Sequence, residues 1–151
     1  MLDQHRIELQ GNDEPLLISG DDLRLEQVLQ NLIQNAVKYS PMGGTITVQV
    51  EAREDWVCVA VHDRGIGIPE ESLPRLFQRF YRAKNADAQH ISGMGVGLYV
   101  VKEIVLLHSG EVEVSSTEGE GSTFTICLPR LEEALVADQA SADSNTLDER
   151  D

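Results

Sequence analysis

The spacing of hydrophobic positions changes several times along this chain, and these changes predict a mixture of helices and strands. In residues 22–39, leucine, isoleucine and alanine recur every three or four positions, as on one face of an amphipathic helix. Residues 45–52 and 56–62 alternate valine or isoleucine with other residues, which is the period of a half-buried strand. The short connection at 53–55 predicts that these two strands form a hairpin.

The remaining segments predict a second hairpin and more helix. The segments at 5–10 and 16–19 predict two short strands around a polar turn, and 111–116 and 122–128 predict a hairpin near the C-terminal end. Residues 70–82 have the pattern of an amphipathic helix interrupted early by Pro74, and 99–108 that of a buried helix. Asp21 or Asp22 is expected to cap the helix at 22–39. Residues 83–92 lack periodicity and are expected to form a mobile loop.

Length and composition limit the domain organisation. A chain of 151 residues suffices for one compact domain, which we place at residues 1–130. Hydrophobic residues make up 41% of the chain but aromatic residues only 5%, so the core is expected to be aliphatic. Residues 131–151 hold seven acids and one arginine and no aromatic residue, which predicts an acidic, disordered C-terminal tail.

Charge and hydropathy exclude some classes of function. The formal net charge of −14 argues against a nucleic-acid surface, which needs a basic patch. No apolar run reaches membrane-spanning length and the N-terminus lacks a signal-peptide pattern, so we expect a soluble, monomeric, cytoplasmic domain without direct membrane contact. The sequence leaves open whether a longer parent protein is anchored in a membrane.

The two cysteines are interpreted as buried, reduced thiols. Cys58 and Cys127 each lie in an apolar, strand-like run, where a free cysteine behaves as a small hydrophobic residue. A disulfide between them is the less favoured alternative. The chain has no CxxC motif and no histidine pair at ligand spacing, so no zinc or haem site is predicted.

The first candidate for chemistry is a polar stripe on the predicted helix at 22–39. Asn31, Asn35 and Lys38 share one side, opposite the apolar face. Two carboxamides and an ammonium suit a hard cation and a phosphate, and Tyr39 beside them adds an aromatic surface for a base. Taken alone, such a stripe is more often a solvated helix face.

Two glycine-containing turns are the next candidates. Asp63 leaves a predicted strand into the turn Asp63-Arg-Gly-Ile-Gly-Ile-Pro69, where its carboxylate could accept from an exocyclic amine and glycine would let the backbone approach a ligand. An ordinary Asp-initiated turn explains that segment equally well. The run Gly93-Met-Gly-Val-Gly-Leu98 feeds a helix and could cradle an anion, but it matches neither the dinucleotide fingerprint nor the Walker loop.

The order of these segments is more informative than any one of them. An Asn-rich helix is followed by the Asp63 turn, by Phe77-Gln-Arg-Phe-Tyr-Arg82, by the glycine run at 93–98 and by Gly119-Glu-Gly-Ser-Thr-Phe124. This order resembles the N, G1, F, G2 and G3 boxes of the ATP-binding catalytic domain of bacterial sensor histidine kinases, over about residues 5–130. The resemblance implies an α+β Bergerat fold, a two-layer α/β sandwich whose mixed, largely antiparallel sheet is covered on one face by helices.

The resemblance also implies roles for individual residues. Asn35 would ligate magnesium with Asn31 beside it, Lys38 would contact phosphate and Tyr39 would lie against the adenine. Asp63 would accept from the adenine amino group. The remaining implied positions shape the base pocket (Gly65, Gly67, Ile68), reach the phosphates from the F box and its flank (Arg79, Tyr81, Arg82) or close a lid over the triphosphate (Gly93, Gly95, Val96, Gly97, Leu98).

The implied function is to bind Mg-ATP and donate the γ-phosphoryl group to a histidine on a separate helical dimerisation domain, in a pathway that continues to a response-regulator receiver domain. Asn35, Lys38 and Arg82 would be the catalytic residues. None of His5, His62, His90 and His108 stands in the family's phosphoacceptor motif.

Two alternatives are an ATP hydrolase of the same fold and a nucleotide-binding regulatory module without catalytic output. Related hydrolases place a glutamate where this chain has Asn31, which disfavours hydrolysis.

Overall fold

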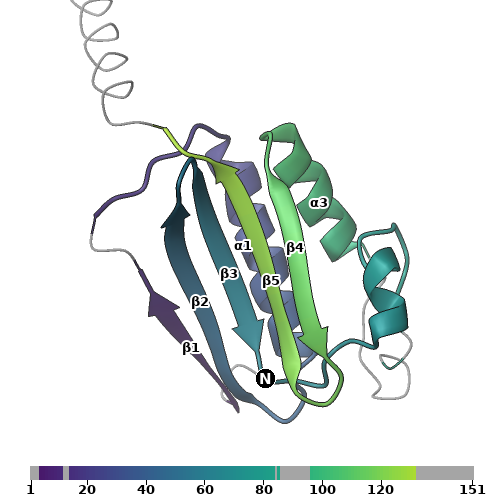
Figure 1. The fold of residues 1–151 in the computed structure, drawn as a ribbon. Helices are drawn as coiled ribbons and strands as arrows, with labels where there is room; N and C mark the ends of the chain where they lie inside the picture. The colour runs from purple at the N-terminus through teal and green to yellow at the C-terminus, as the bar shows by residue number, and fades with distance from the viewer. Residues whose placement is uncertain (1–3, 12–13, 84, 86–95, 132–151) are drawn as a thin grey trace, which may run out of the picture.

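The fold is a five-stranded sheet with helices on one face (Figure 1). The computed structural model describes residues 4–11, 14–83, 85 and 96–131. The strand order is β1-β2-β3-β5-β4, with β1 parallel to β2 and all other neighbours antiparallel. The strands are β1 (His5–Gln10), β2 (Gly44–Arg53), β3 (Trp56–Asp63), β4 (Glu111–Thr117) and β5 (Gly121–Pro129). The predicted α+β sandwich with a mixed, largely antiparallel sheet is confirmed.

Two long helices cover one face of this sheet. They are α1 (Asp22–Lys38) and α3 (Gly97–Leu107), which lie behind the sheet in Figure 1. The Asp21 side chain accepts hydrogen bonds from the backbone N–H groups of Leu23 and Arg24 and so caps α1. Helix α3 begins two residues before the predicted start, so Gly97 and Leu98 belong to its first turn.

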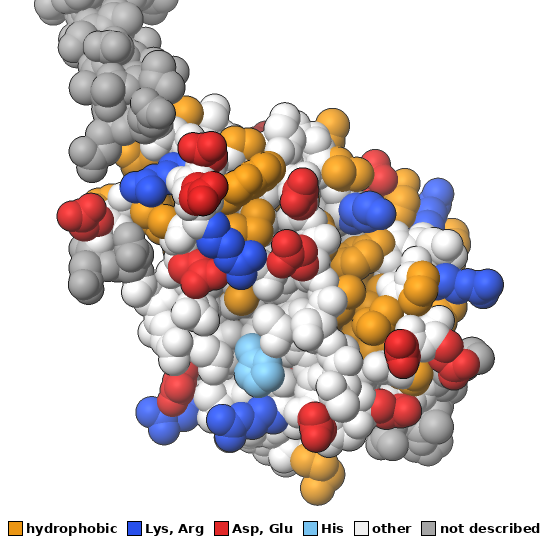
Figure 2. All heavy atoms as spheres, viewed as in Figure 1, with side chains coloured by type: hydrophobic (Ala, Val, Ile, Leu, Met, Phe, Trp, Pro, Cys, Tyr) orange, Lys and Arg blue, Asp and Glu red, His pale blue; other side chains and the backbone are white. Residues whose placement is uncertain are grey.

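The core lies between the helices and the inner face of the sheet, and it is aliphatic as predicted. Val48 pairs with Val61, and Val61 with Phe124, so the buried residues of neighbouring strands form rows across the sheet. Val28, Leu32, Val101 and Val105 of the helices pack against these rows. The opposite face of the sheet carries no helix among the described elements, and Figure 2 shows it as a largely polar surface.

Two sequence predictions of local structure are wrong. Residues 16–19 do not form a strand of the sheet: Ile18 makes only an isolated bridge with Arg130, just beyond the end of β5. The predicted helix at 70–82 is the short 3-10 helix η2 (Glu70–Arg75). Pro74 lacks a backbone N–H and disfavours α geometry in the residue before it, and Phe80 has a positive φ of 66°.

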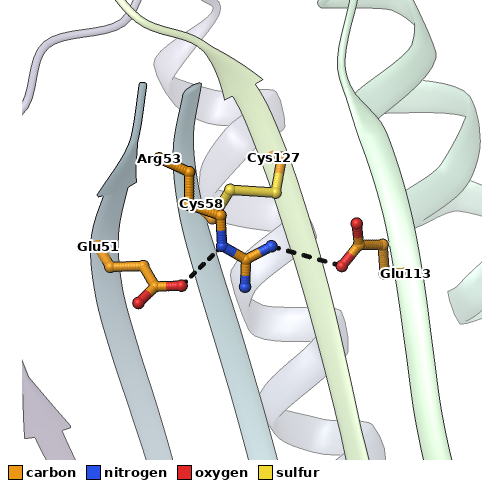
Figure 3. The surroundings of a disulfide bond; sticks show 5 residues. All are labelled: Glu51, Arg53, Cys58, Glu113 and Cys127. Carbon is orange, nitrogen blue, oxygen red and sulfur yellow. Dashed lines mark hydrogen bonds and ion pairs between the residues drawn. A yellow bond between two sulfur atoms is a disulfide. The ribbon is translucent and has the colours of Figure 1, made fainter. Parts of the chain in front are cut away.

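The predicted reduced thiols are also wrong, because Cys58 and Cys127 form a disulfide. The two residues are opposite one another in β3 and β5, with their Cα atoms 4.1 Å apart, on the face away from the helices. Figure 3 shows the Arg53 guanidinium beside this bond, between the carboxylates of Glu51 and Glu113, and its nitrogens lie 2.7 and 3.5 Å from the nearest oxygens of the two. The hydrogen bond to Glu51 is the main cause of a raised pKa of Arg53.

Some predictions fall outside the described residues. These are most of the loop at 83–92, the glycines Gly93 and Gly95, and the tail beyond Leu131. Within the described part of the chain, no helix is both long enough and apolar enough to cross a membrane.

Candidate nucleotide-binding site

A polar row at the end of the sheet marks the candidate site. On the inner face, Val61, Phe124 and Val114 form an apolar row across β3, β5 and β4. Two residues further along, the row directly beside it consists of Asp63, Ser122 and Ser116. Strand side chains alternate with a period of two, so this polar row continues the core-facing side of the sheet. The hydrophobic core therefore ends at a line of hydrogen-bonding groups.

The Asp63 carboxyl group is the central feature of this row. Its side chain is 1% exposed, and Oδ1 accepts a hydrogen bond from the Gly65 N–H at 2.9 Å. Within the described residues, Oδ2 has no hydrogen-bond partner. Burial raises the pKa of Asp63 to about 6, against the opposing effect of the Gly65 and Ser122 backbone N–H groups and of His62. A buried carboxylate oxygen without a protein donor fits a ligand that supplies one, such as an exocyclic amine.

The turn after Asp63 is held between the end of α1 and the β4–β5 turn. The Ile66 N–H donates to the Tyr39 carbonyl oxygen at 2.9 Å, and the Gly119 N–H donates to the Ile66 carbonyl oxygen at 2.7 Å. A Cβ atom at Gly65 would overlap the Tyr39 carbonyl oxygen, and one at Gly67 (φ +71°) would overlap the Thr117 carbonyl oxygen. Both glycines are thus required for backbone to approach backbone.

The polar stripe of α1 meets the start of α3. Asn31 Nδ2 donates to the Gly97 carbonyl oxygen at 3.4 Å. Asn31 and Asn35 are half-buried, whereas Lys38 is exposed at the last turn of α1. Tyr39 ends the helix and, through its carbonyl oxygen, joins it to the Asp63 turn. Four predicted segments are therefore neighbours: the stripe, the Asp63 turn, the β4–β5 turn and the first turn of α3.

The segment after η2 is attached to the core by Phe77. The Phe77 ring meets the Phe124 ring edge-on, with centroids 6.2 Å apart, and the Lys102 ammonium lies 5.8 Å from the Phe77 centroid. The Arg79 guanidinium lies over the exposed Phe80 ring at 4.7 Å. Tyr81 packs against the core and Arg82 is half-buried. The contacts described for Arg79 therefore place it beside Phe80 and not on the α1 stripe.

Three polar residues of this region were not identified from the sequence. Ser116 and Ser122 occupy inner positions that valine, phenylalanine and isoleucine fill elsewhere in β4 and β5, so the break in alternation was the available signal. The third is Asn85, whose Nδ2 donates to the Gly67 carbonyl oxygen at 3.0 Å. It lies in an aperiodic segment and gave no signal.

The donor set indicates what kind of metal site is possible here. Among the residues that the structure describes, no three His, Cys, Asp or Glu side chains are grouped so as to hold a metal ion. A carboxamide such as that of Asn35 supplies one hard oxygen ligand. That suits Mg²⁺, which commonly keeps waters and phosphate oxygens as its other ligands.

A buried acceptor beside a backbone-lined turn, a half-buried carboxamide stripe and a helix N-terminus together define a nucleotide-binding α/β sandwich domain. A family model described as "Histidine kinase-, DNA gyrase B-, and HSP90-like ATPase" matches residues 20–132. The chain belongs to this family, and its relatives identify it as the ATP-binding catalytic domain of a sensor histidine kinase.

Curated relatives and solved structures agree on this assignment. The chain is 42% identical over 123 residues to the sensor histidine kinase WalK of Bacillus subtilis, covering 80% of this chain and 20% of that protein. The mycobacterial sensor histidine kinase MprB superimposes with a TM-score of 0.69 at 30% identity, covering 82% of each chain. Full-length ShkA in complex with AMPPNP gives a TM-score of 0.67 at 28% identity, covering 82% of this chain and 26% of that one.

Proposed function

We propose that this chain binds Mg-ATP and donates the γ-phosphoryl group to a histidine on a separate helical dimerisation domain, which in turn serves a response-regulator receiver domain. The observation that carries the proposal is Asp63 Oδ2, a buried carboxylate oxygen without a hydrogen-bond partner among the described residues. ShkA, a structural neighbour whose full-length structure is in complex with AMPPNP, supports nucleotide binding as the activity.

The base would lie at the end of β3. Asp63 accepts a hydrogen bond from the adenine amino group, since its Oδ2 atom has no donor among the residues that the structure describes. The fixed turn of Gly65, Gly67 and Ile68 forms the wall of the pocket, and Tyr39, at the end of α1, lies against the ring.

The phosphates would lie between α1 and the start of α3. Asn35, with Asn31 beside it, ligates the magnesium ion through a carboxamide oxygen, and Lys38 contacts phosphate. The N-terminus of α3 is the positive end of a helix dipole. The residues proposed to complete the phosphate site are those of the F box and its flank (Arg79, Tyr81, Arg82) and of the lid (Gly93, Gly95, Val96, Gly97, Leu98).

Phosphoryl transfer needs positioning and charge neutralisation more than covalent chemistry from the protein. Lys38 and Arg82 offset charge on the transferring group and hold it in line with an incoming imidazole. When bound, Mg²⁺ would supply the largest positive charge at the phosphates. Asn31 occupies the position of the water-activating glutamate of related hydrolases and cannot act as a general base. The site therefore favours transfer to an imidazole, which is itself a nucleophile.

We place the domain in the cytoplasm as a monomer.

A transfer assay tests this function. The chain is mixed with the helical dimerisation fragment of its own full-length protein and with ATP labelled at the γ-phosphate. Acid-labile label on a histidine of that fragment is the expected result. Steady phosphate release by the chain alone would instead make it a hydrolase, and nucleotide binding with neither reaction would make it a regulatory module.

Two substitutions test the residue assignments. Asp63→Ala removes the proposed acceptor and Asn35→Ala the proposed magnesium ligand, and each is expected to weaken ATP binding by about tenfold or more. The Asn35→Ala loss should largely disappear when magnesium is omitted. Gln49→Ala, an exposed residue on the outer face of β2, is the control. Calorimetry showing unchanged affinity in both test variants would rule out this site.

A further inference from the structure

We infer that Ser116, on β4, is a positioning residue that fixes the base pocket by joining the Asp63 turn to the β4–β5 hairpin. This inference rests on the proposed ATP-binding function and adds a residue to the specificity of the same site. Ser116 itself lies beyond the residues proposed to touch the nucleotide, and its effect is exerted through Ile68, Gly121 and Ser122.

The Ser116 hydroxyl group is fully used in three hydrogen bonds. Its Oγ accepts from the Ile68 N–H at 2.8 Å and donates to the Gly121 carbonyl oxygen at 2.9 Å. Oγ also lies 2.7 Å from Ser122 Oγ. A serine hydroxyl has one hydrogen and two lone pairs, so once its hydrogen is directed to Gly121, it must accept from Ser122. The hydroxyl therefore fixes the direction of the Ser122 O–H as well.

Each of these three partners adjoins the pocket from a different side. Ile68 is 3% exposed and belongs to the Asp63 turn, so its N–H would be buried without a partner if Ser116 lost its oxygen. A Cβ atom at Gly121 would overlap the Asp63 carbonyl oxygen, which places that glycine directly against the strand end that carries the carboxylate. Ser122 pairs with Asp63 across the sheet, and its backbone N–H lowers the Asp63 pKa.

The Ser116 hydroxyl group thus fixes the position of Ile68, in the wall of the proposed pocket, relative to the Asp63 carboxylate, which is proposed to bind the base. The turn and the hairpin are also linked by the hydrogen bond from the Gly119 N–H to the Ile66 carbonyl oxygen, which backbone groups alone make. The Ser116 link, in contrast, depends on the side chain. Without it, Ile68 and Asp63 should no longer hold one fixed geometry, and the base should be bound less tightly while the phosphate contacts remain.

The test compares side chains that differ by the hydroxyl group. Ser116→Ala removes it; Ser116→Thr and Ser116→Val have nearly the same shape and suit a strand, but only threonine keeps the oxygen. Ser115→Ala, the exposed neighbour on the opposite face of β4, is the matched control. Each full chain is titrated with ATP and, separately, with inorganic tripolyphosphate, which has no base, and the KM for ATP and kcat are measured in the transfer assay.

The expected result is about tenfold weaker ATP binding and a correspondingly raised KM for Ser116→Ala and Ser116→Val. Tripolyphosphate affinity and kcat should stay within twofold of the unaltered protein, and Ser116→Thr and Ser115→Ala should bind ATP normally. ATP affinity in the alanine and valine variants that is unchanged from that of the unaltered protein would overturn the positioning role, and so would an equal loss of affinity for ATP and for tripolyphosphate. If the unaltered chain bound no ATP at all, the proposed function itself would be rejected, and with it the inference that rests on it.

A measurement on the unaltered protein covers the case in which the variants do not fold. Amide hydrogen exchange should show the Ile68 N–H protected before nucleotide is added, because its acceptor is a protein side chain. Exchange at the rate of an exposed amide would mean that the Ser116 link does not hold the turn, and would exclude the inference.

Discussion

Asp63 combines a cost to stability with the role in binding that we propose for it. Its folded-state pKa of about 6 lies above the ordinary value of 3.8, mainly because burial disfavours the charged form. The stability contributed by the protonated carboxyl is fully present below pH 3.8 and is lost as pH rises through about 6. At neutral pH the protein therefore holds a buried carboxylate at the expense of folding stability, as expected of a group retained for its ligand.

The first prediction follows from that balance. Asp63→Asn should raise the free energy of unfolding at pH 7 to 8 by about 1–3 kcal/mol, because the neutral amide avoids the burial of a charge. At pH 4 the gain should shrink towards zero, since the native carboxyl is then protonated in the folded state. Urea unfolding at the two pH values measures this, and a gain of equal size at both would show that charge is not its cause.

The second prediction concerns ligand binding by the same residue. Adenosine affinity should fall as pH drops through about 6, because a protonated Asp63 loses its acceptor character towards the base amine. Adenosine is the appropriate probe since it has no phosphate that titrates in this range. An NMR titration from pH 5 to 8 measures the change. Asp63→Asn should show no such step, and a step of the same size in that variant would assign it to another group.

At the scale of elements, His108 connects the two helices at the end away from the polar row. Its Nδ1 lies 2.8 Å from the Ile104 carbonyl oxygen of α3, and its Nε2 accepts from the Asp21 N–H at 3.0 Å, just before α1. The donor to Ile104 must be Nδ1–H, so the neutral tautomer serves both bonds. A Cβ atom at Gly20 would press on this ring, so the chain entering α1 is closely packed against it.

The third prediction removes this connection. His108→Leu should lower the free energy of unfolding by about 1–3 kcal/mol, because two hydrogen bonds are lost and the N-terminal end of α1 is released. His108→Gln, which can keep an acceptor for the Asp21 N–H, should lose less. Thermal unfolding tests this ranking of stabilities, with Glu103→Gln, at an exposed position of α3, as the control. Equal stability of the leucine variant and the unaltered chain would contradict it.

Helices and strands with a regular spacing of hydrophobic residues could be predicted from the sequence. Segments whose structure depends on local backbone chemistry or on long-range contacts could not. The alternation of Val57, Val59 and Val61 predicted β3 because each position meets the core. Helix prediction failed after Arg75, where Pro74 and the positive φ of Phe80 outweigh the apolar spacing. Residues 16–19 have a strand composition, yet Ile18 makes only a single isolated bridge, with Arg130.

For the candidate site, the sequence could indicate individual residues but not how they align in space. Asp63 and the glycines were identifiable because their order along the chain is a family pattern. Ser116 and Ser122 were missed, since their alignment with Asp63 depends on the register of three strands, which a sequence does not show. The disulfide was missed for that reason too: Cys58 and Cys127 are 69 positions apart and meet only through the β3–β5 register.

At the scale of the whole molecule, the disulfide joins the two central strands on the face opposite the helices. It closes a loop of 69 residues. A cross-link over a longer loop removes more conformational entropy from the unfolded chain. The fourth prediction is that reduction lowers the free energy of unfolding by about 2–4 kcal/mol.

This prediction is checked by denaturant unfolding with and without dithiothreitol. The double variant Cys58→Ala/Cys127→Ala should show no response to the reductant and should resemble the reduced protein. An unfolding midpoint of the unaltered chain that does not move on reduction would mean that the bond is absent or without effect. Nucleotide affinity should change little, because the bond lies on the other side of the sheet from Asp63.

The polar row of Asp63, Ser122 and Ser116 is the last row of the sheet, beyond the apolar rows that form the core. The base contact assigned to Asp63 therefore lies next to the apolar rows and not within them. Guanine presents a carbonyl oxygen where adenine presents an amine, so a donor at the end of β3 would invert the preference. The domain is thus a suitable scaffold for engineering an enzyme that accepts a different purine cofactor, with redesign confined to one edge of the sheet.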